Sequence, residues 1–299
     1  MITVKKYLIV IILSIIVGVS FDFALKKVTH KNTVQHLSPI IYQNSKPTVA
    51  ITASPTPTII LPSPTPKPVT IEELNLKYGP CAKVNVLMYH HIQPESEAKK
   101  LNQGGLTVAP EFFKKHLEYL KAQGYTTIFP GALANFFDNG ISLPKKPVII
   151  TLDDAYEDNY LYAFPIIKEL GLKATIFTPT GLVTVPDYLT WNEIKEMASS
   201  GLVYFGNHTW SHQNSQTSLQ KLDMEIGTAD KQLAENNLNS AKVFAYPYGK
   251  PSTGAEETLT KYGYKLAFTT VHGSIACKQK RFDIPRIRVG NAPLSSYGL

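Results

Sequence analysis

The feature that most constrains this fold is an alternation, from about Tyr78 onward, of short apolar runs with segments of helical periodicity. The runs are rich in β-branched and aromatic residues, which favour strands. The eight predicted strands lie at 84–89, 126–129, 148–152, 174–178, 203–206, 243–246, 266–269 and 284–289. Strands that alternate with helices predict a parallel α/β domain, and such domains gather their active sites at the carboxyl ends of the strands.

Three of the intervening helices have clear boundary signals. Pro110 suits a first helical turn, apolar residues follow it at helical spacing, and Gly124 ends the pattern. Thr190 and Glu193 form a capping-box pattern at the start of a second helix. A longer helix is predicted over 218–236.

The first 70 residues have a different character. Lys5 and Lys6 precede an apolar run at 7–21, an order typical of an export signal or a membrane anchor. From about 45 to 69 the chain is rich in Pro, Thr and Ser, which favours an extended spacer. We therefore predict a signal peptide or membrane anchor at 1–27, a linker at 28–70 and a folded domain at 71–299 outside the cytoplasm.

The formal net charge of +7 lies mostly outside the predicted domain, because residues 1–80 carry +5 and residues 81–299 carry only +2. No dense patch of Lys and Arg interleaved with aromatic residues occurs in the domain. This distribution argues against nucleic-acid binding.

The two cysteines, Cys81 and Cys277, lie near opposite ends of the predicted domain. In an exported protein such a pair can form a disulfide that closes a long loop. Two unrelated thiols are the alternative.

Polar side chains follow two of the central predicted strands. Asp153 and Asp154 come directly after one strand, so that one carboxylate can bind a cation while the other takes a proton. His208 and His212 follow the next but one, and histidines four residues apart can chelate one metal. The alternatives are a helix N-cap with an acidic surface and a pair of ordinary polar histidines.

Two further strand ends carry candidate site residues. His90 and His91 follow the first predicted strand, where strand-end packing is the alternative role. Pro247, Tyr248 and Gly249 follow the strand at 243–246 and predict a tight loop whose backbone N–H can face a ligand, although an ordinary turn has the same signature.

Together these features resemble the NodB-like polysaccharide deacetylases of carbohydrate esterase family four. The family motif T-F-D-D-G is similar to residues 151–155 (TLDDA), H-[ST]-x-x-H to 208–212 (HTWSH), and R-x-P-Y-G to 245–249 (AYPYG). The motifs occur in family order within about 83–290. The resemblance implies a distorted (β/α) barrel and makes 71–299 a catalytic domain that acts on a polysaccharide.

Two positions depart from the family pattern. Ala245 stands in place of the Arg of the third motif, and the late L-x-H motif with its catalytic histidine is absent. A subgroup that acts on poly-β-1,6-N-acetylglucosamine takes this histidine from its first strand, in a Y-H context that Tyr89-His90 resembles. We predict that Arg286, on the last strand with Arg288, replaces the missing Arg as a partner of Asp153; solvent-exposed strand charges are the alternative.

The resemblance also implies a role for each motif residue. Asp154, His208 and His212 would hold Zn²⁺, or another divalent metal such as Co²⁺, Ni²⁺ or Mn²⁺. Asp153 would be the general base and His90 the general acid.

The substrate-binding residues implied are Tyr248, whose N–H would bind the oxyanion, with Pro247 beside it, and Trp191 and Trp210 as walls of a sugar site. For each tryptophan, a place in the core is the alternative.

The predicted function is metal-dependent removal of N-acetyl groups from an amino-sugar polysaccharide, with poly-β-1,6-N-acetylglucosamine as the candidate polymer. The alternatives are a peptidoglycan or chitin deacetylase, a xylan esterase on the same fold, a non-catalytic carbohydrate-binding relative and a structural wall protein.

Overall fold

Seven parallel strands close into a barrel in the computed structural model, which describes residues 69–299. In spatial order they are β2 (Asn85–Tyr89), β12 (Ile284–Arg288), β10 (Leu266–His272), β9 (Val243–Ala245), β8 (Val203–Asn207), β7 (Ala174–Thr178) and β6 (Pro147–Asp153). A parallel pairing of β2 with β6 completes the ring. The expected distorted (β/α) barrel is therefore confirmed for this part of the chain, with fewer than eight strands in the ring.

Shorter strands lie outside the ring. They are β5 (Thr126–Thr127), which pairs with the start of β6; β1 (Cys81–Lys83), which pairs with β11 (Ile275–Cys277); and β3 (His91–Ile92), which pairs with β4 (Thr107–Val108). The predicted strand at 126–129 is only two residues long, because Phe129 is already the N-cap of a helix that begins at Pro130.

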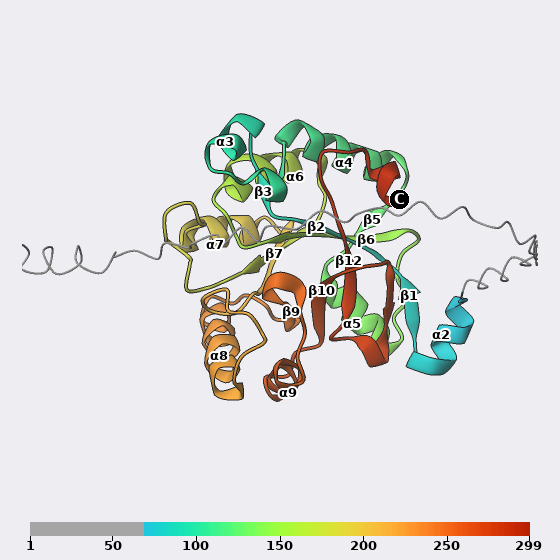
Figure 1. Ribbon diagram of the computed structural model, residues 1–299. Coiled ribbons are helices and arrows are strands. Elements are labelled where there is room, and N and C mark those ends of the chain that lie inside the picture. The colour runs from blue at the N-terminus through green and yellow to red at the C-terminus, as the bar shows by residue number, and fades with distance from the viewer. Residues whose placement is uncertain (1–68) are drawn as a thin grey trace, which may run out of the picture. The chain divides into compact units, whose positions relative to one another are not determined.

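Helices surround the barrel, as Figure 1 shows. They are α2 (Ile71–Tyr78), α3 (Glu95–Lys100), α4 (Pro110–Ala122), α5 (Pro130–Asn139), α6 (Phe164–Leu170), α7 (Trp191–Ser199), α8 (Leu219–Glu235) and α9 (Thr253–Lys261). The capping box of α7 is formed, since the Thr190 hydroxyl accepts from Glu193 N and the Glu193 carboxylate accepts from Thr190 N. The three predicted helices are thus confirmed within one or two residues.

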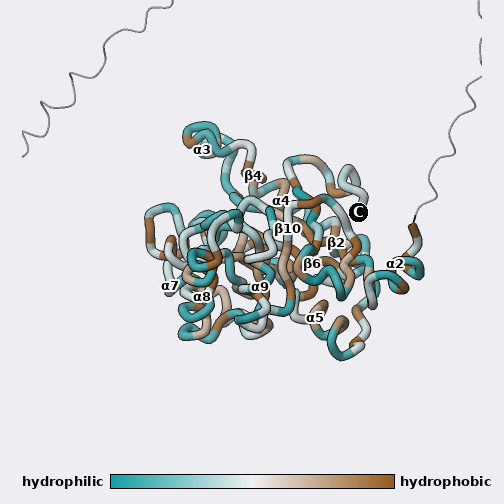
Figure 2. Tube along the Cα trace, turned by 60° about the horizontal axis from the view of Figure 1, so that its bottom comes forward, coloured by the Kyte–Doolittle hydropathy of each residue, from teal (hydrophilic) through white to brown (hydrophobic). Residues whose placement is uncertain are grey.

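The barrel strands are buried on both faces, as expected for parallel strands under a layer of helices. Successive residues along a barrel strand therefore pack into two different hydrophobic clusters, one outside the ring and one on its other face. Leu87 and Ile150 pack with helical residues such as Leu117 outside the ring, whereas Val86 and Ile149 pack with Phe177 on the other face. In Figure 2 the hydrophobic stretches gather on these central strands.

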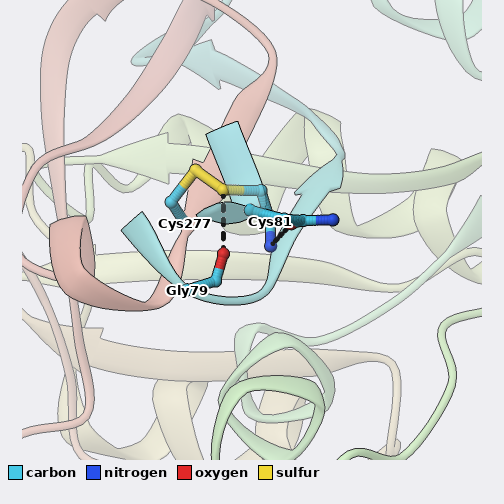
Figure 3. The surroundings of a disulfide bond; sticks show 4 residues. Gly79, Cys81 and Cys277 are labelled. Carbon is cyan, nitrogen blue, oxygen red and sulfur yellow. Dashed lines mark hydrogen bonds between the residues drawn. A yellow bond between two sulfur atoms is a disulfide. The ribbon is translucent and has the colours of Figure 1, made fainter. Parts of the chain in front are cut away.

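A disulfide bond joins Cys81 of β1 to Cys277 of β11 (Figure 3). The same pair of strands is aligned by backbone hydrogen bonds, and Val84 N donates to Ser274 O just beyond it at 2.8 Å. The disulfide therefore ties the entry of the barrel domain to a segment almost two hundred residues later, with a sequence separation of 196.

The predicted membrane or signal segment and nearly all of the predicted linker lie outside the described residues. Within residues 69–299, no helix has both the length and the apolar character needed to cross a bilayer. The first described helix, α2, begins at Ile71, where the folded domain was predicted to start.

Candidate active site

Three potential metal ligands converge at one rim of the barrel. Oδ1 of Asp154 lies 3.3 Å from Nε2 of His208 and 3.1 Å from Nε2 of His212. Asp154 follows β6 and His208 follows β8, so the parallel register brings the ends of these strands to the same rim. The predicted metal-ligand residues are therefore assembled in space.

The protonation pattern of this cluster suits a cation. Nδ1 of His208 lies 2.7 Å from the carbonyl oxygen of Ala245, which can only accept, so Nδ1 carries a proton and, in the neutral ring that a metal would bind, Nε2 presents its lone pair toward Asp154. Burial lowers the pKa of His208, but Asp154 and Asp153 outweigh burial, so without a metal this pKa is raised. Oδ1 of Asp154 is buried and has no hydrogen-bond partner among the described residues. Buried acceptors that face one another are costly unless a cation lies between them. The residues thus fit a divalent metal such as Zn²⁺, with room for further ligands.

The second carboxylate has a partner within the protein. Arg286 is fully buried and binds Asp153 with both ends of its guanidinium, at 2.7 Å for each N–O pair. The guanidinium also donates to the carbonyl oxygen of Thr269 at 2.7 Å and to the Thr151 hydroxyl at 3.2 Å. Burial raises the pKa of Asp153, but Arg286 outweighs burial, so that the net effect lowers this pKa. Asp153 is consequently ionised at neutral pH.

The neighbouring histidines at the end of β2 point to different places. His90 lines the same pocket as Asp153 and Asp154, whereas His91 is hydrogen-bonded to Asp158, with Nδ1 and Oδ2 2.5 Å apart. The His91 ring also stacks on Tyr156, with ring centroids 3.6 Å apart. Burial lowers the pKa of His90, while the negative charges of Asp153 and Asp154 act in the opposite direction. His90 is therefore neutral in the free enzyme at neutral pH.

These groups line a cavity of about 500 Å³. Its lining residues are His90, Leu106, Asp153, Asp154, Tyr156, His208, His212, Tyr246, Tyr248, Thr270 and Arg288. Tyr248 is an exposed lip of this cavity, and its ring packs edge-on against His212 at 4.8 Å between centroids. Pro247 is buried behind it.

The two tryptophans lie outside the lining of this cavity. Trp191 begins α7 and is partly buried against the hydrophobic core. Trp210 is partly exposed and lies tightly over Gly181, at which a Cβ would come within 2.6 Å of the indole nitrogen. The predicted sugar-binding role of either ring stays a prediction.

Several site residues adopt left-handed backbone, which is costly for residues other than glycine. The φ values are 76° at Asp154, 56° at Ala155, 66° at Thr209, 59° at His212 and 61° at Tyr248. Such strain is typical of functional sites whose surroundings hold it in place. It also explains why the family motif places Gly where this chain has Ala155.

Sequence reasoning missed Tyr156 and Glu225. Burial raises the pKa of Tyr156, so its hydroxyl stays protonated and can donate into the cavity. Glu225 is fully buried on α8 and binds the loop that carries His212. A signal for Glu225 was present, because it interrupts the apolar face formed by Leu222, Ile226 and Ala229.

Comparisons with known proteins agree with this geometry. The polysaccharide deacetylase family model matches residues 140–267, which include Asp153, Asp154, His208 and His212. Streptococcus pyogenes deacetylase PplD, solved in complex with acetate, is 30% identical with a TM-score of 0.66, over 72% of this chain and 98% of that one.

Two curated relatives extend the comparison. YxkH of Bacillus subtilis is 29% identical over 209 residues, which are 70% of this chain and 72% of that protein. The poly-β-1,6-N-acetyl-D-glucosamine N-deacetylase of Staphylococcus aureus strain MSSA476 is 27% identical over 232 residues, covering 73% of this chain and 79% of that enzyme. With the barrel and its motif residues, these matches show that the chain belongs to the polysaccharide deacetylase family and is a hydrolase.

Proposed function

We propose that this protein removes N-acetyl groups from an amino-sugar polysaccharide outside the cytoplasm, in a reaction that requires a divalent metal. The observation that carries the proposal is the contrast between two adjacent carboxylates. Asp154 faces two histidine nitrogens and pairs with no Lys or Arg among the described residues, whereas Asp153 is held ionised by Arg286. A hydrolase of this family needs a cation site and a base side by side, and these residues offer both.

Asp154, His208 and His212 would hold the metal, which when bound acts as a Lewis acid that makes an amide carbonyl more electrophilic and water more acidic. The ionised carboxylate of Asp153 accepts a proton from the attacking water. Its bidentate contact with Arg286 fixes the direction of the carboxylate and leaves one lone pair on each oxygen for this proton.

The leaving group is an amine, and its departure requires a proton. His90 is the candidate donor, because it lines the cavity and is not part of the metal-ligand set. Since burial keeps His90 neutral at rest, its ring has to take up a proton during the reaction, and Asp153 is a nearby source. The backbone N–H of Tyr248 is the candidate donor to the oxyanion. The carbon–nitrogen bond breaks, and acetate and a free amino sugar are released.

The candidate polymer is poly-β-1,6-N-acetylglucosamine. Two observations support it: the S. aureus relative bears that activity in its name, and the pocket histidine His90 directly follows Tyr89, the last residue of β2, a Y-H context that resembles the subgroup acting on this polymer. The apolar run at 7–21 and the Pro-rich segment after it support action at the cell surface, with the domain held at a membrane or released.

Acetate release tests the proposal. The protein would be assayed on β-1,6-linked N-acetylglucosamine oligomers, chitooligomers and peptidoglycan, before and after exhaustive chelation and after readdition of Zn²⁺ or Co²⁺. We expect release that disappears with chelation, returns with metal and is fastest on the β-1,6-linked oligomers. Full activity after chelation would refute metal dependence, and a preference for another polymer would refute the substrate.

A further inference from the structure

The loop between β8 and α8 carries two of the three metal-ligand candidates, His208 and His212, and parts of its backbone are strained. Thr209 and His212 have φ values of 66° and 59°, in the left-handed region that disfavours side chains with a Cβ, most of all β-branched ones. Contacts from outside this loop, which runs from 208 to 218, help to hold its shape: Thr180 N donates to Thr209 O at 3.2 Å and Gly181 N donates to Trp210 O at 2.7 Å.

The two histidines of the loop are held differently. The ring of His208 is oriented by its own hydrogen bond from Nδ1 to the carbonyl oxygen of Ala245. Within residues 69–299, no comparable hydrogen bond holds the second ring nitrogen of His212, whose Nε2 faces Asp154 at 3.1 Å. The direction of His212 therefore depends on how the backbone on each side of it is held: Gln213 N donates to the Thr209 hydroxyl at 2.9 Å, and Ser211 is held on the other side.

Ser211 is fastened to α8 by Glu225. One carboxylate oxygen of Glu225 accepts from Ser211 N at 2.8 Å and the other accepts from the Ser211 hydroxyl at 2.7 Å. Lys221 lies 3.1 Å from the same carboxylate and is partly exposed. Glu225 itself is fully buried among apolar neighbours, a position that rarely holds a carboxylate without a specific partner.

We infer that Glu225 is a positioning residue for the metal site, which sets the direction of His212 by holding Ser211 through two hydrogen bonds. The inference rests on the proposed metal dependence. It assigns to α8 a part in metal affinity, although α8 supplies no ligand. Residues that orient metal ligands typically contribute about 10–100-fold to metal affinity.

Two substitutions separate this role from a merely structural one. Glu225→Leu fits the apolar face of α8 and removes both acceptors. Replacement of a whole buried ion pair by apolar residues is often tolerated, and here the partner Lys221 is partly exposed and can be solvated once the carboxylate is gone. Because Ser211 is exposed, its freed N–H can reach water when the loop relaxes. Glu225→Gln keeps a carbonyl oxygen for Ser211 N and an amide that can donate to the hydroxyl. Lys221→Met is the matched control on the same helix, since it leaves both Ser211 bonds in place.

The experiment is a Co²⁺ titration of the full-length protein, followed by the visible spectrum of the bound ion, with melting of the metal-free forms as a measure of folding. We expect Glu225→Leu to bind Co²⁺ about 10–100-fold more weakly, with an altered spectrum. Glu225→Gln and Lys221→Met should stay close to the wild type in both readouts.

Wild-type affinity and spectrum in a folded Glu225→Leu variant would overturn the inference while leaving metal dependence intact. If Glu225→Leu does not fold, Ser211→Ala decides, because it removes one of the two bonds: weaker Co²⁺ binding supports the inference, and unchanged binding overturns it. A wild-type protein that binds no Co²⁺ would overturn the proposed metal dependence, and this inference with it.

Discussion

Asp153 and Asp154 are neighbours in sequence, both buried, and yet they lie in opposite electrostatic surroundings. Asp153 ends β6 and faces Arg286, whose guanidinium meets both of its oxygens. Asp154 lies one residue beyond the strand, with φ of 76°, and faces the nitrogens of His208 and His212. Asp153 therefore has a cationic partner within the chain, the guanidinium of Arg286, whereas Asp154 faces imidazole nitrogens.

This difference shows how the surroundings of an aspartate can suit it to either of two chemical roles. A carboxylate neutralised by a fixed guanidinium stays ionised and oriented but keeps free lone pairs, which suits a proton acceptor. A carboxylate that shares its space with two imidazole lone pairs is favourable only with a cation, which suits a metal ligand. The proposed roles therefore follow from the groups around each carboxylate, a guanidinium at Asp153 and two imidazoles at Asp154, and not from the carboxylates themselves.

Substitution on the cation-binding side should have the largest effect. Asp154→Ala removes the only anionic member of the ligand set, so we expect loss of measurable acetate release together with loss of bound metal, determined by elemental analysis. Chelation of the wild type should reproduce the same loss. An Asp154→Ala protein that retained its metal and activity would break the comparison outright.

The next largest effect is expected at Asp153, the proposed base. Asp153→Asn keeps the shape and removes the charge, so turnover should fall by about 10²–10⁴-fold, the usual contribution of a general base. Metal content should remain that of the wild type. Equal loss of metal in Asp153→Asn and Asp154→Ala would show that the two carboxylates do not divide the roles.

A smaller loss is expected at the end of β2. His90→Ala should lower kcat by about 10²-fold, near the low end for acid–base catalysis, while metal content and melting temperature are kept. His91→Ala is the matched control, because His91 faces Asp158 outside the cavity. A greater kinetic loss in His91→Ala than in His90→Ala would show that His90 is not the general acid.

Replacement of Arg286 should change the pH dependence. As the proposed base, Asp153 would act only when ionised, so kcat/KM should fall as the pH falls through its pKa, which Arg286 lowers. In Arg286→Gln this pKa rises, and the acidic limb of the kcat/KM profile should move to higher pH by about 1–3 units. If a folded Arg286→Gln variant kept the acidic limb of its kcat/KM profile at the wild-type pH, Arg286 would not control the pKa of the base. Metal-free melting serves as the folding control.

The disulfide should have the smallest effect on catalysis. Cys81 and Cys277 lie on β1 and β11, outside the barrel ring and outside the lining of the active-site cavity. In the double Ser variant we expect unchanged kcat and Co²⁺ affinity, with a free energy of unfolding lower by about 2–4 kcal/mol in denaturant titrations. A change in metal affinity would connect this distant region to the site.

Much of the fold was readable along the chain. The strand at 174–178 matches β7 in full, and the helix at 218–236 differs from α8 by one residue at each end. The short strands β1, β3, β4 and β11 were not predicted, because two or three residues carry no periodicity and pair only when folding brings them together.

The sequence by itself determined the local facts: which runs become strands, where Asp153, Asp154, His208 and His212 follow them, and that parallel strand ends share a rim. The sequence also predicted Arg286 as a partner of Asp153, but only the tertiary structure decided between this role and solvent exposure, with the two side chains meeting across 133 positions. The contact by which Glu225 of α8 holds Ser211 came from the tertiary structure alone. The physical reason is that periodicity and turn chemistry act over a few residues. Side-chain pairing across a barrel depends instead on strand register, where a shift of one residue turns a side chain to the opposite face.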